Sequence, residues 1–179
     1  MKNLFFLTFL ISFVFSSCEN DSLSPLPVKV EGQFVKFEIT KKQLVASEFE
    51  TTAFGGLMTD LSGTIVRYDL YVRRTNAQGY VLNDYVKLQT ITSFPFQLSV
   101  TPAQIAQAIG MNVADLQVSD VFRFKGFSYD ASGKEVGYLN LSRVLQTTDT
   151  MQQGYKFNTD IVPTPQDLDP KFDNRSEAF

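Results

Sequence analysis

Apolar and polar residues alternate along much of the chain, and this pattern predicts β-strands. In the segment Phe34–Thr40, the residues after Phe34 alternate between apolar and polar, which is typical of a strand that buries one face. The alternation is stronger from Thr64 to Arg74, where we expect one buried and one outer face. The expected buried residues are Val66, Tyr68, Leu70 and Val72, and the expected outer residues are Arg67, Asp69, Tyr71 and Arg73.

Five later segments complete the predicted strands. They cover residues 85–91, 94–100, 120–129, 135–141 and 155–162. In the third of these segments, Phe122 and Phe124 are expected to face one way, and the other way is faced by Val121, Arg123, Lys125, Phe127 and Tyr129. Polar loops that contain Gly79 and Gly133 separate consecutive strands and are typical of hairpin turns. Pro95 cannot donate a backbone hydrogen bond, so the strand near it is expected at a sheet edge or a bend.

A short helical insertion over about residues 102–116 interrupts the predicted strands. Thr101 is a favourable N-cap, Pro102 fits the first helical position, and Gln104 completes a capping box. Gly110 is a typical stop signal, and a second short turn follows it. We expect the insertion to cover one end of a sheet and assign it no chemical role.

Seven predicted strands joined by short turns and one helical insertion indicate a mainly β fold. We expect an antiparallel immunoglobulin- or fibronectin-like β-sandwich over residues 28–162. Twelve of the 17 phenylalanines lie beyond residue 17 and are expected to fill much of its core. Residues 163–179 contain three prolines and scattered charges, so we expect a loose C-terminal tail.

The first 17 residues have the pattern of a signal peptide. Lys2 precedes a 12-residue apolar run, Leu4–Phe15, which is interrupted by Thr8 and Ser12. Spanning a bilayer takes about 20 residues, whereas a run of this length suits the apolar region of a signal peptide. Residues 18–27 are rich in serine, proline and acidic residues, and we expect them to form a flexible tether.

The segment from Phe15 to Cys18 (FSSC) resembles the lipobox of bacterial lipoproteins, with Phe15 where leucine is more usual. The resemblance implies cleavage before Cys18 and acylation of that residue. Two or three acyl chains anchor a protein stably, since each buried methylene adds roughly 0.8 kcal/mol. The alternative is an ordinary secreted protein in which Cys18 has no such role. Glu19, Asn20 and Asp21 resemble the acidic stretch of Bacteroidota lipoproteins that are exported to the cell surface, or else simply belong to the tether.

Two stretches of the predicted domain resemble small surface lipoproteins of Bacteroidota. They are residues 65–72 (IVRYDLYV) and residues 101–124, which include the runs TPAQI, VADL and SDVFRF. Such lipoproteins are often encoded beside SusC/SusD-type outer-membrane uptake pairs and have immunoglobulin-like sandwiches. The resemblance implies a fold and a setting, and it transfers no active-site residue.

Composition and charge narrow the possible chemistry. The chain has no histidine and a single cysteine, which excludes histidine-dependent triads, zinc sites of histidine and cysteine, and internal disulfides. The formal net charge is −3. We expect the basic doublets Lys41-Lys42 and Arg73-Arg74 to be solvated surface, so nucleic acid is not an expected partner. The C-terminal acidic residues lack the ligand pattern of an EF-hand loop, and no metal or cofactor is expected.

Tyrosines beside arginines form the candidate binding surface. Tyr71 lies between Arg67 and Arg73 on the expected outer face, and Tyr80 and Tyr85 lie on or beyond the next loop. Such a composition is typical of surfaces that bind a sugar ring or a protein partner. The alternative is that these residues cover the second face of a sheet, with arginine stems packed over the rings.

Together these features suggest a non-enzymatic outer-membrane lipoprotein that faces the cell exterior. In the setting that the resemblance implies, it would be an accessory subunit of a SusC/SusD-type complex. Its tyrosine- and arginine-rich surface would bind a glycan, a peptide or a protein partner. The alternative is a structural subunit of an outer-membrane assembly without a small-molecule ligand. We assign no catalytic residue, and an enzyme that uses paired acids such as Glu48 and Glu50 is a distant third alternative.

Overall fold

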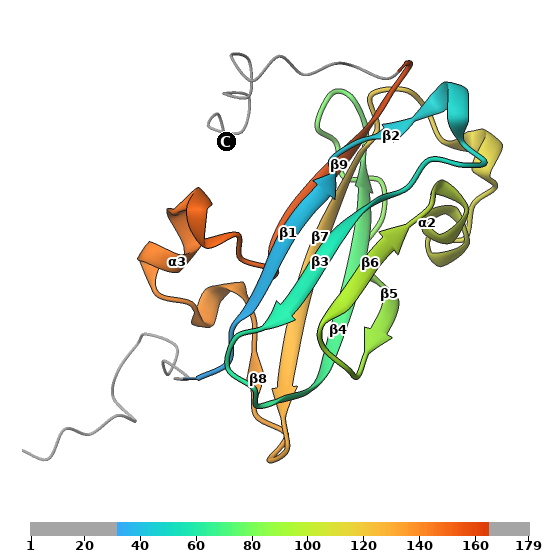
Figure 1. Cartoon of the computed structure of the whole chain (residues 1–179). Coiled ribbons are helices and arrows are strands. Elements are labelled where there is room, and N and C mark those ends of the chain that lie inside the picture. Colours follow the sequence, from blue (N-terminus) through green and yellow to red (C-terminus); the bar gives the residue numbers. More distant parts are fainter. Residues whose placement is uncertain (1–31, 165–179) are drawn as a thin grey trace, which may run out of the picture.

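Two β-sheets packed face to face make up residues 32–164, which are the residues described by the computed structural model (Figure 1). The smaller sheet contains, in order, β1 (Val35–Lys41), β3 (Phe54–Asp60) and β6 (Phe96–Val100). The larger sheet contains, in order, β2 (Leu44–Val45), β9 (Lys156–Val162), β7 (Val121–Asp130), β4 (Ile65–Thr75) and β5 (Val86–Ile91), and β8 (Glu135–Val136) pairs with β7. The predicted mainly β sandwich is therefore confirmed.

Strand directions agree with the prediction in all but one pair of the described strands. Every pair is antiparallel except β2 with β9, which is parallel. An immunoglobulin- or fibronectin-like arrangement within this class stays a prediction. The predicted leader (residues 1–17), Cys18, Glu19–Asp21 and the tail beyond residue 164 lie outside the described residues.

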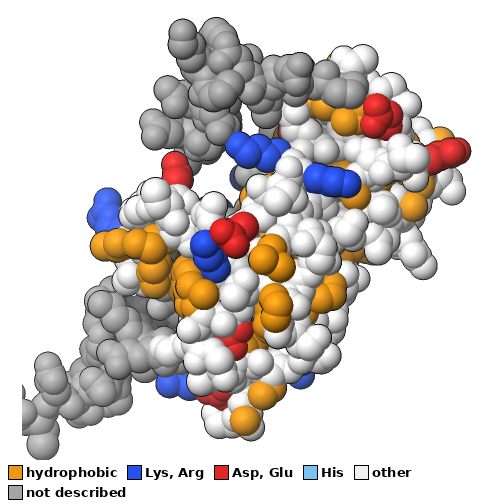
Figure 2. Space-filling view, viewed as in Figure 1, with side chains coloured by type: hydrophobic (Ala, Val, Ile, Leu, Met, Phe, Trp, Pro, Cys, Tyr) orange, Lys and Arg blue, Asp and Glu red, His pale blue; other side chains and the backbone are white. Residues whose placement is uncertain are grey.

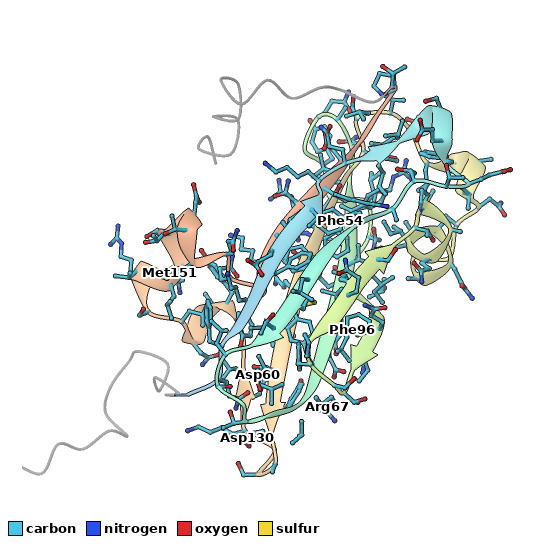
Figure 3. The ribbon with its side chains drawn as sticks, viewed as in Figure 1. Phe54, Asp60, Arg67, Phe96, Asp130 and Met151 are labelled. Carbon is cyan, nitrogen blue, oxygen red and sulfur yellow. The ribbon has the colours of Figure 1, made fainter. Side chains whose placement is uncertain are left out.

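Phenylalanines join the two sheets, as their number in the sequence predicts. Phe54 of the smaller sheet stacks on Phe124 and Phe157 of the larger sheet, with ring centroids 5.4 and 5.9 Å apart. Phe37 meets Phe54 edge to face at 5.9 Å. Phe54 is labelled in Figure 3. Because these rings come from strands far apart in the chain, their packing fixes how the sheets sit on one another.

Strand β3 was not predicted, because two glycines interrupt its side-chain pattern. A Cβ on Gly55 would overlap the carbonyl oxygen of Leu98 in β6, and a Cβ on Gly56 would overlap that of Glu38 in β1. Glycine is therefore required in this central strand, although glycine weakens the usual sequence signal of a strand.

Strand β4 follows the predicted alternation except at its beginning. A shift in register against β7 between Ile65 and Arg67 places Ile65 in the core and leaves Val66 49% exposed, so the prediction that Val66 is buried was wrong. Beyond this bulge, Tyr68, Leu70 and Val72 are fully buried as predicted. Arg74 is the next residue on the inward side of β4 and is only 7% exposed. The prediction that Arg74 is solvated was therefore wrong.

The helical insertion is confirmed. Helix α2 (Pro102–Ala108) has Thr101 as its N-cap, and the capping box with Gln104 is complete. Gly110 follows with φ +73°, and the 3₁₀ turn η3 (Val113–Asp115) leads toward β7. In Figure 1 these turns lie beside one end of the sandwich, next to β6.

The predicted strand over residues 135–141 was mostly wrong, since only the two residues of β8 pair as a strand. The chain then forms η4 (Tyr138–Asn140), α3 (Arg143–Thr147) and η5 (Asp149–Met151). A similar short turn elsewhere in the chain, η2 (Ala46–Glu48), follows β2. Local capping explains the difference: the Gly137 N–H donates to Asn140 Oδ1 at 2.8 Å, and the Leu145 N–H donates to Ser142 Oγ at 3.5 Å. Within residues 32–164, no helix is long and apolar enough to cross a membrane.

Candidate binding surface

The side of the larger sheet that points away from the smaller sheet carries most of the candidate residues, and we call it the outer face. Side chains alternate along a strand, so the neighbours of the buried core positions in β4 and β7 point to this face. Its residues are Arg67, Asp69, Tyr71 and Arg73 from β4, Arg123, Lys125, Phe127 and Tyr129 from β7, and Lys156 and Asn158 from β9. The sheet places β4 next to β7 and β7 next to β9, so these three rows lie side by side.

Two arginine–tyrosine contacts lie at opposite ends of the β4 row. Arg73 Cζ is 4.7 Å from the centre of the Tyr85 ring, and Arg67 Cζ is 3.9 Å from the centre of the Tyr129 ring. Burial raises the pKa of Tyr85, although the charges of Arg73 and Arg123 act in the opposite direction. The arginines thus lie over rings, as the covering alternative expects, and the same contacts hold the cations in defined places.

The remaining candidate tyrosines lie in different surroundings. Tyr71 is half-buried between the two arginines and meets Phe127 edge to face, with centroids 5.7 Å apart. Tyr80 is 70% exposed in the loop after β4, and no ring contact, ion pair or side-chain hydrogen bond among residues 32–164 joins it to the other candidates. The structure therefore gathers Arg67, Tyr71, Arg73 and Tyr85 on one face and leaves Tyr80 apart.

Asp69 neutralises one end of the outer face. It is 4% exposed, accepts a hydrogen bond from Thr90 Oγ1 at 2.7 Å, and pairs with Lys87 Nζ at 2.9 Å and Arg67 Nε at 3.6 Å. Burial alone would raise the pKa of Asp69. The hydrogen bonds from Lys87 and Thr90 and the charges of Lys87 and Arg67 outweigh burial and hold it below its ordinary value.

Tyr129 and Glu135 form a second polar contact at this end. The Tyr129 hydroxyl donates to Glu135 Oε2 at 2.6 Å. Burial, together with this hydrogen bond and the Glu135 charge, raises the pKa of Tyr129 to about 12, although the nearby Arg67 acts in the opposite direction. Tyr129 therefore remains a neutral donor at physiological pH and is a poor candidate for a general base.

Sequence reasoning missed the contributions of β7 and β9 to this surface. It placed Arg123, Lys125, Phe127 and Tyr129 on one face of their own strand but did not join that face to the arginines and tyrosines near residue 70. The pairing Arg73 with Arg123 spans 50 positions along the chain, and the sequence carries no local signal for it. Arg123 and Lys125, two residues apart and so on the same side of β7, were the signal that could have indicated this surface.

A separate cleft of about 330 Å³ lies at the end of the sandwich where β3 turns into β4. Asp60 at its wall is labelled in Figure 3. Its Oδ1 accepts from the Ser62 N–H at 2.8 Å and from Ser62 Oγ at 2.5 Å, and its Oδ2 accepts from the Ile65 N–H at 3.0 Å. Burial would raise the pKa of Asp60, but these hydrogen bonds lower it, so the carboxylate holds the turn in place.

Arg67 and Arg73 of the outer face thus both lie over aromatic rings. A cation held over an aromatic ring can attract an anion or a planar group. Within residues 32–164, no group of three or more acidic residues is placed to hold a metal ion. Comparisons of the chain with protein-family models, curated proteins and solved structures found no match.

Proposed function

We propose that this protein is a non-enzymatic, surface-exposed lipoprotein of the outer membrane. In this proposal it binds a ligand or a protein partner through its outer face, as an accessory subunit of a SusC/SusD-type complex. The observation that carries the binding function is the row of Arg67, Tyr71 and Arg73 with Tyr85 on one face of the larger sheet. Exposed or half-buried tyrosine and arginine side chains are the residue types that dominate binding energy at many interfaces.

The anchoring part of the proposal rests on the sequence around Cys18. A 12-residue apolar run, two serines and then the only cysteine of the chain fit a lipoprotein leader. Acylation of Cys18 would supply a stable membrane anchor, because several acyl chains act together. The absence of histidine supports binding in preference to acid–base catalysis, since histidine is the most common general base near neutral pH.

Expression of the full chain in a bacterium that processes lipoproteins tests the anchor. The intact mass of the mature protein should correspond to a chain that begins at an acylated Cys18, and Cys18→Ser should release the protein from the membrane fraction. An unmodified N-terminus in the membrane-derived protein would contradict the proposed anchor.

Affinity purification of the lipidated protein from membranes tests the binding surface. We expect a partner or ligand to be retained, and the double variant Tyr71→Ala with Tyr85→Ala to lose it. Lys41→Gln, on the exposed end of β1 in the other sheet, is the control and should retain it. Retention by the double variant would show that another surface binds. A stable protein complex that shows no response to glycans or peptides would favour the structural-subunit alternative.

A further inference from the structure

Four basic residues lie together on the outer face, and we call them the basic cluster: Arg73, Arg123, Lys125 and Lys156. Arg73 lies directly opposite Arg123 on the neighbouring strand, and Lys125 lies directly opposite Lys156. Directly opposed residues have Cβ atoms about 4.5–5.5 Å apart. Residues two apart along a strand are about 6.5–7 Å apart. The four side chains therefore start from a compact area.

No carboxylate among residues 32–164 pairs with the basic cluster. Within residues 32–164, none of its four residues forms an ion pair, and Arg73 Nε is buried without a hydrogen-bond partner. Asp69 on the same face already pairs with two other cations. Asp160 lies beyond Asn158 on β9, and its Oδ1 accepts a hydrogen bond from Gln43 Nε2 at 3.3 Å.

Like charges placed directly opposite one another destabilise a sheet, so this arrangement has a cost in the unliganded protein. On the face shown in Figure 2, basic and acidic side chains are scattered among uncharged ones, and on β1 Lys36 Nζ pairs with Glu38 Oε1 at 2.8 Å. A chain with a net charge of −3 thus concentrates unpaired positive charge on one face.

Aromatic rings hold the charged ends of the cluster in place. Lys125 Nζ is 4.3 Å from the centre of the Tyr85 ring that Arg73 also contacts, and Lys156 Nζ is 4.9 Å from the centre of the Tyr138 ring. A ring orders a cation without neutralising it. Less side-chain entropy is then lost when an anion binds.

We propose that the basic cluster binds an acidic polysaccharide, a sugar chain that bears carboxylate or sulfate groups. This proposal deepens the proposed function and rests on it. The exposed amide of Asn158, opposite Arg123, and the hydroxyl of Tyr85 offer hydrogen bonds to sugar hydroxyls beside the cations. Asp69 and Asp160 on either side limit the positive area, which disfavours a long nucleic-acid track.

Calorimetry with the mature full-length protein tests the proposal with defined probes. The carboxylated probe is polygalacturonate, the sulfated probe is dextran sulfate, and the neutral probe is dextran. We expect at least one acidic polysaccharide to bind, with an affinity that falls as salt rises, and neutral dextran not to bind. Polyglutamate and a single-stranded oligonucleotide are the competing polyanions, and both should bind more weakly.

Variants place the binding on the cluster. Arg123→Gln and Lys125→Gln should each weaken binding about fivefold, as expected for one partly exposed charge pair. Lys41→Gln removes an equal charge from the other sheet and should leave the affinity within twofold. Far-UV circular dichroism checks that each variant is folded.

Three results would overturn the proposal: no binding of either acidic polysaccharide, equal or stronger binding of polyglutamate or the oligonucleotide, or affinities unchanged in both cluster variants. Each of these results is distinct from failure of the proposed function. That failure would appear as an unmodified N-terminus at Cys18 or as retention of a membrane partner by the Tyr71 and Tyr85 double variant.

Discussion

A buried ion pair between Arg74 and Asp120 fastens the helical insertion to the larger sheet. Arg74 is at the end of β4 with its side chain 9% exposed, and Asp120 precedes β7 with its side chain 2% exposed. Asp120 Oδ2 lies 2.7 Å from Arg74 Nη2 and 2.8 Å from Nε, and it also accepts from the Gln117 N–H at 2.8 Å. Arg74 Nη2 donates further to the carbonyl oxygen of Asp115 at 3.3 Å.

Asp120→Asn removes the negative charge and leaves the Arg74 guanidinium buried without a counter-charge. Removing one partner of such a pair costs about 3–5 kcal/mol of the free energy of unfolding. With an m value of about 2 kcal/mol per molar urea, the urea concentration at the midpoint of unfolding should fall by about 1.5–2.5 M. Equilibrium urea unfolding of the full chain, followed by circular dichroism, measures this shift.

The exposed pair of Lys36 and Glu38 provides the control, since its side chains are 30% and 44% exposed. Glu38→Gln should cost less than about 1 kcal/mol. The double variant Arg74→Met with Asp120→Leu should recover much of the lost stability, because two apolar residues leave no buried charge. If Asp120→Asn costs no more than Glu38→Gln, the pair does not hold the insertion in the way described.

Three further predictions concern the core, a glycine and an acidic group. Phe54→Ala should lower the free energy of unfolding by about 3–5 kcal/mol in a urea titration, whereas Leu57→Ala, at a 36% exposed position of the same strand, should cost far less. Gly126→Ala should lower the melting temperature, because its Cβ would overlap the Tyr68 hydroxyl, and adding Tyr68→Phe should restore part of the loss. Asp69→Asn should lower stability near pH 7. The loss of stability relative to the unsubstituted protein should shrink once the pH falls below about 4, the ordinary pKa of Asp. It should vanish as the pH passes below the lowered folded pKa of Asp69, and thermal melts from pH 2 to 7 would show this.

Alternation predicted strands well where one face is buried and the other is solvated. Strand β4 is found near its predicted limits for this reason, and its buried face is correct from Tyr68 onward. The pattern cannot reveal a bulge, because one extra residue reverses the face of everything before it, as at Val66. It is also silent at β3, where Gly55 and Gly56 carry no side chain to alternate.

The candidate surface was partly predictable for the same physical reason. Period-2 alternation within β4 placed Arg67, Tyr71 and Arg73 on one face, and the structure agrees. The charges that meet them come from β7 and β9, and strand order and register depend on packing between distant segments. Arg123 and Lys156 therefore entered the surface only through the structure.

The opposition of Arg73 and Arg123 allows stability and binding to be separated. If the basic cluster exists for a ligand, Arg123→Gln should weaken binding and yet raise the free energy of unfolding by roughly 0.2–1 kcal/mol, because it removes a like-charge pair. The gain in the free energy of unfolding should be larger in low salt than in 0.5 M salt. At 0.5 M the screening length is only about 4–5 Å, so the repulsion between the two arginines is weaker. Urea titrations at both salt concentrations measure it. A loss of stability in Arg123→Gln would instead mean that Arg123 supports the sheet, and the cluster would then have a structural reason to exist.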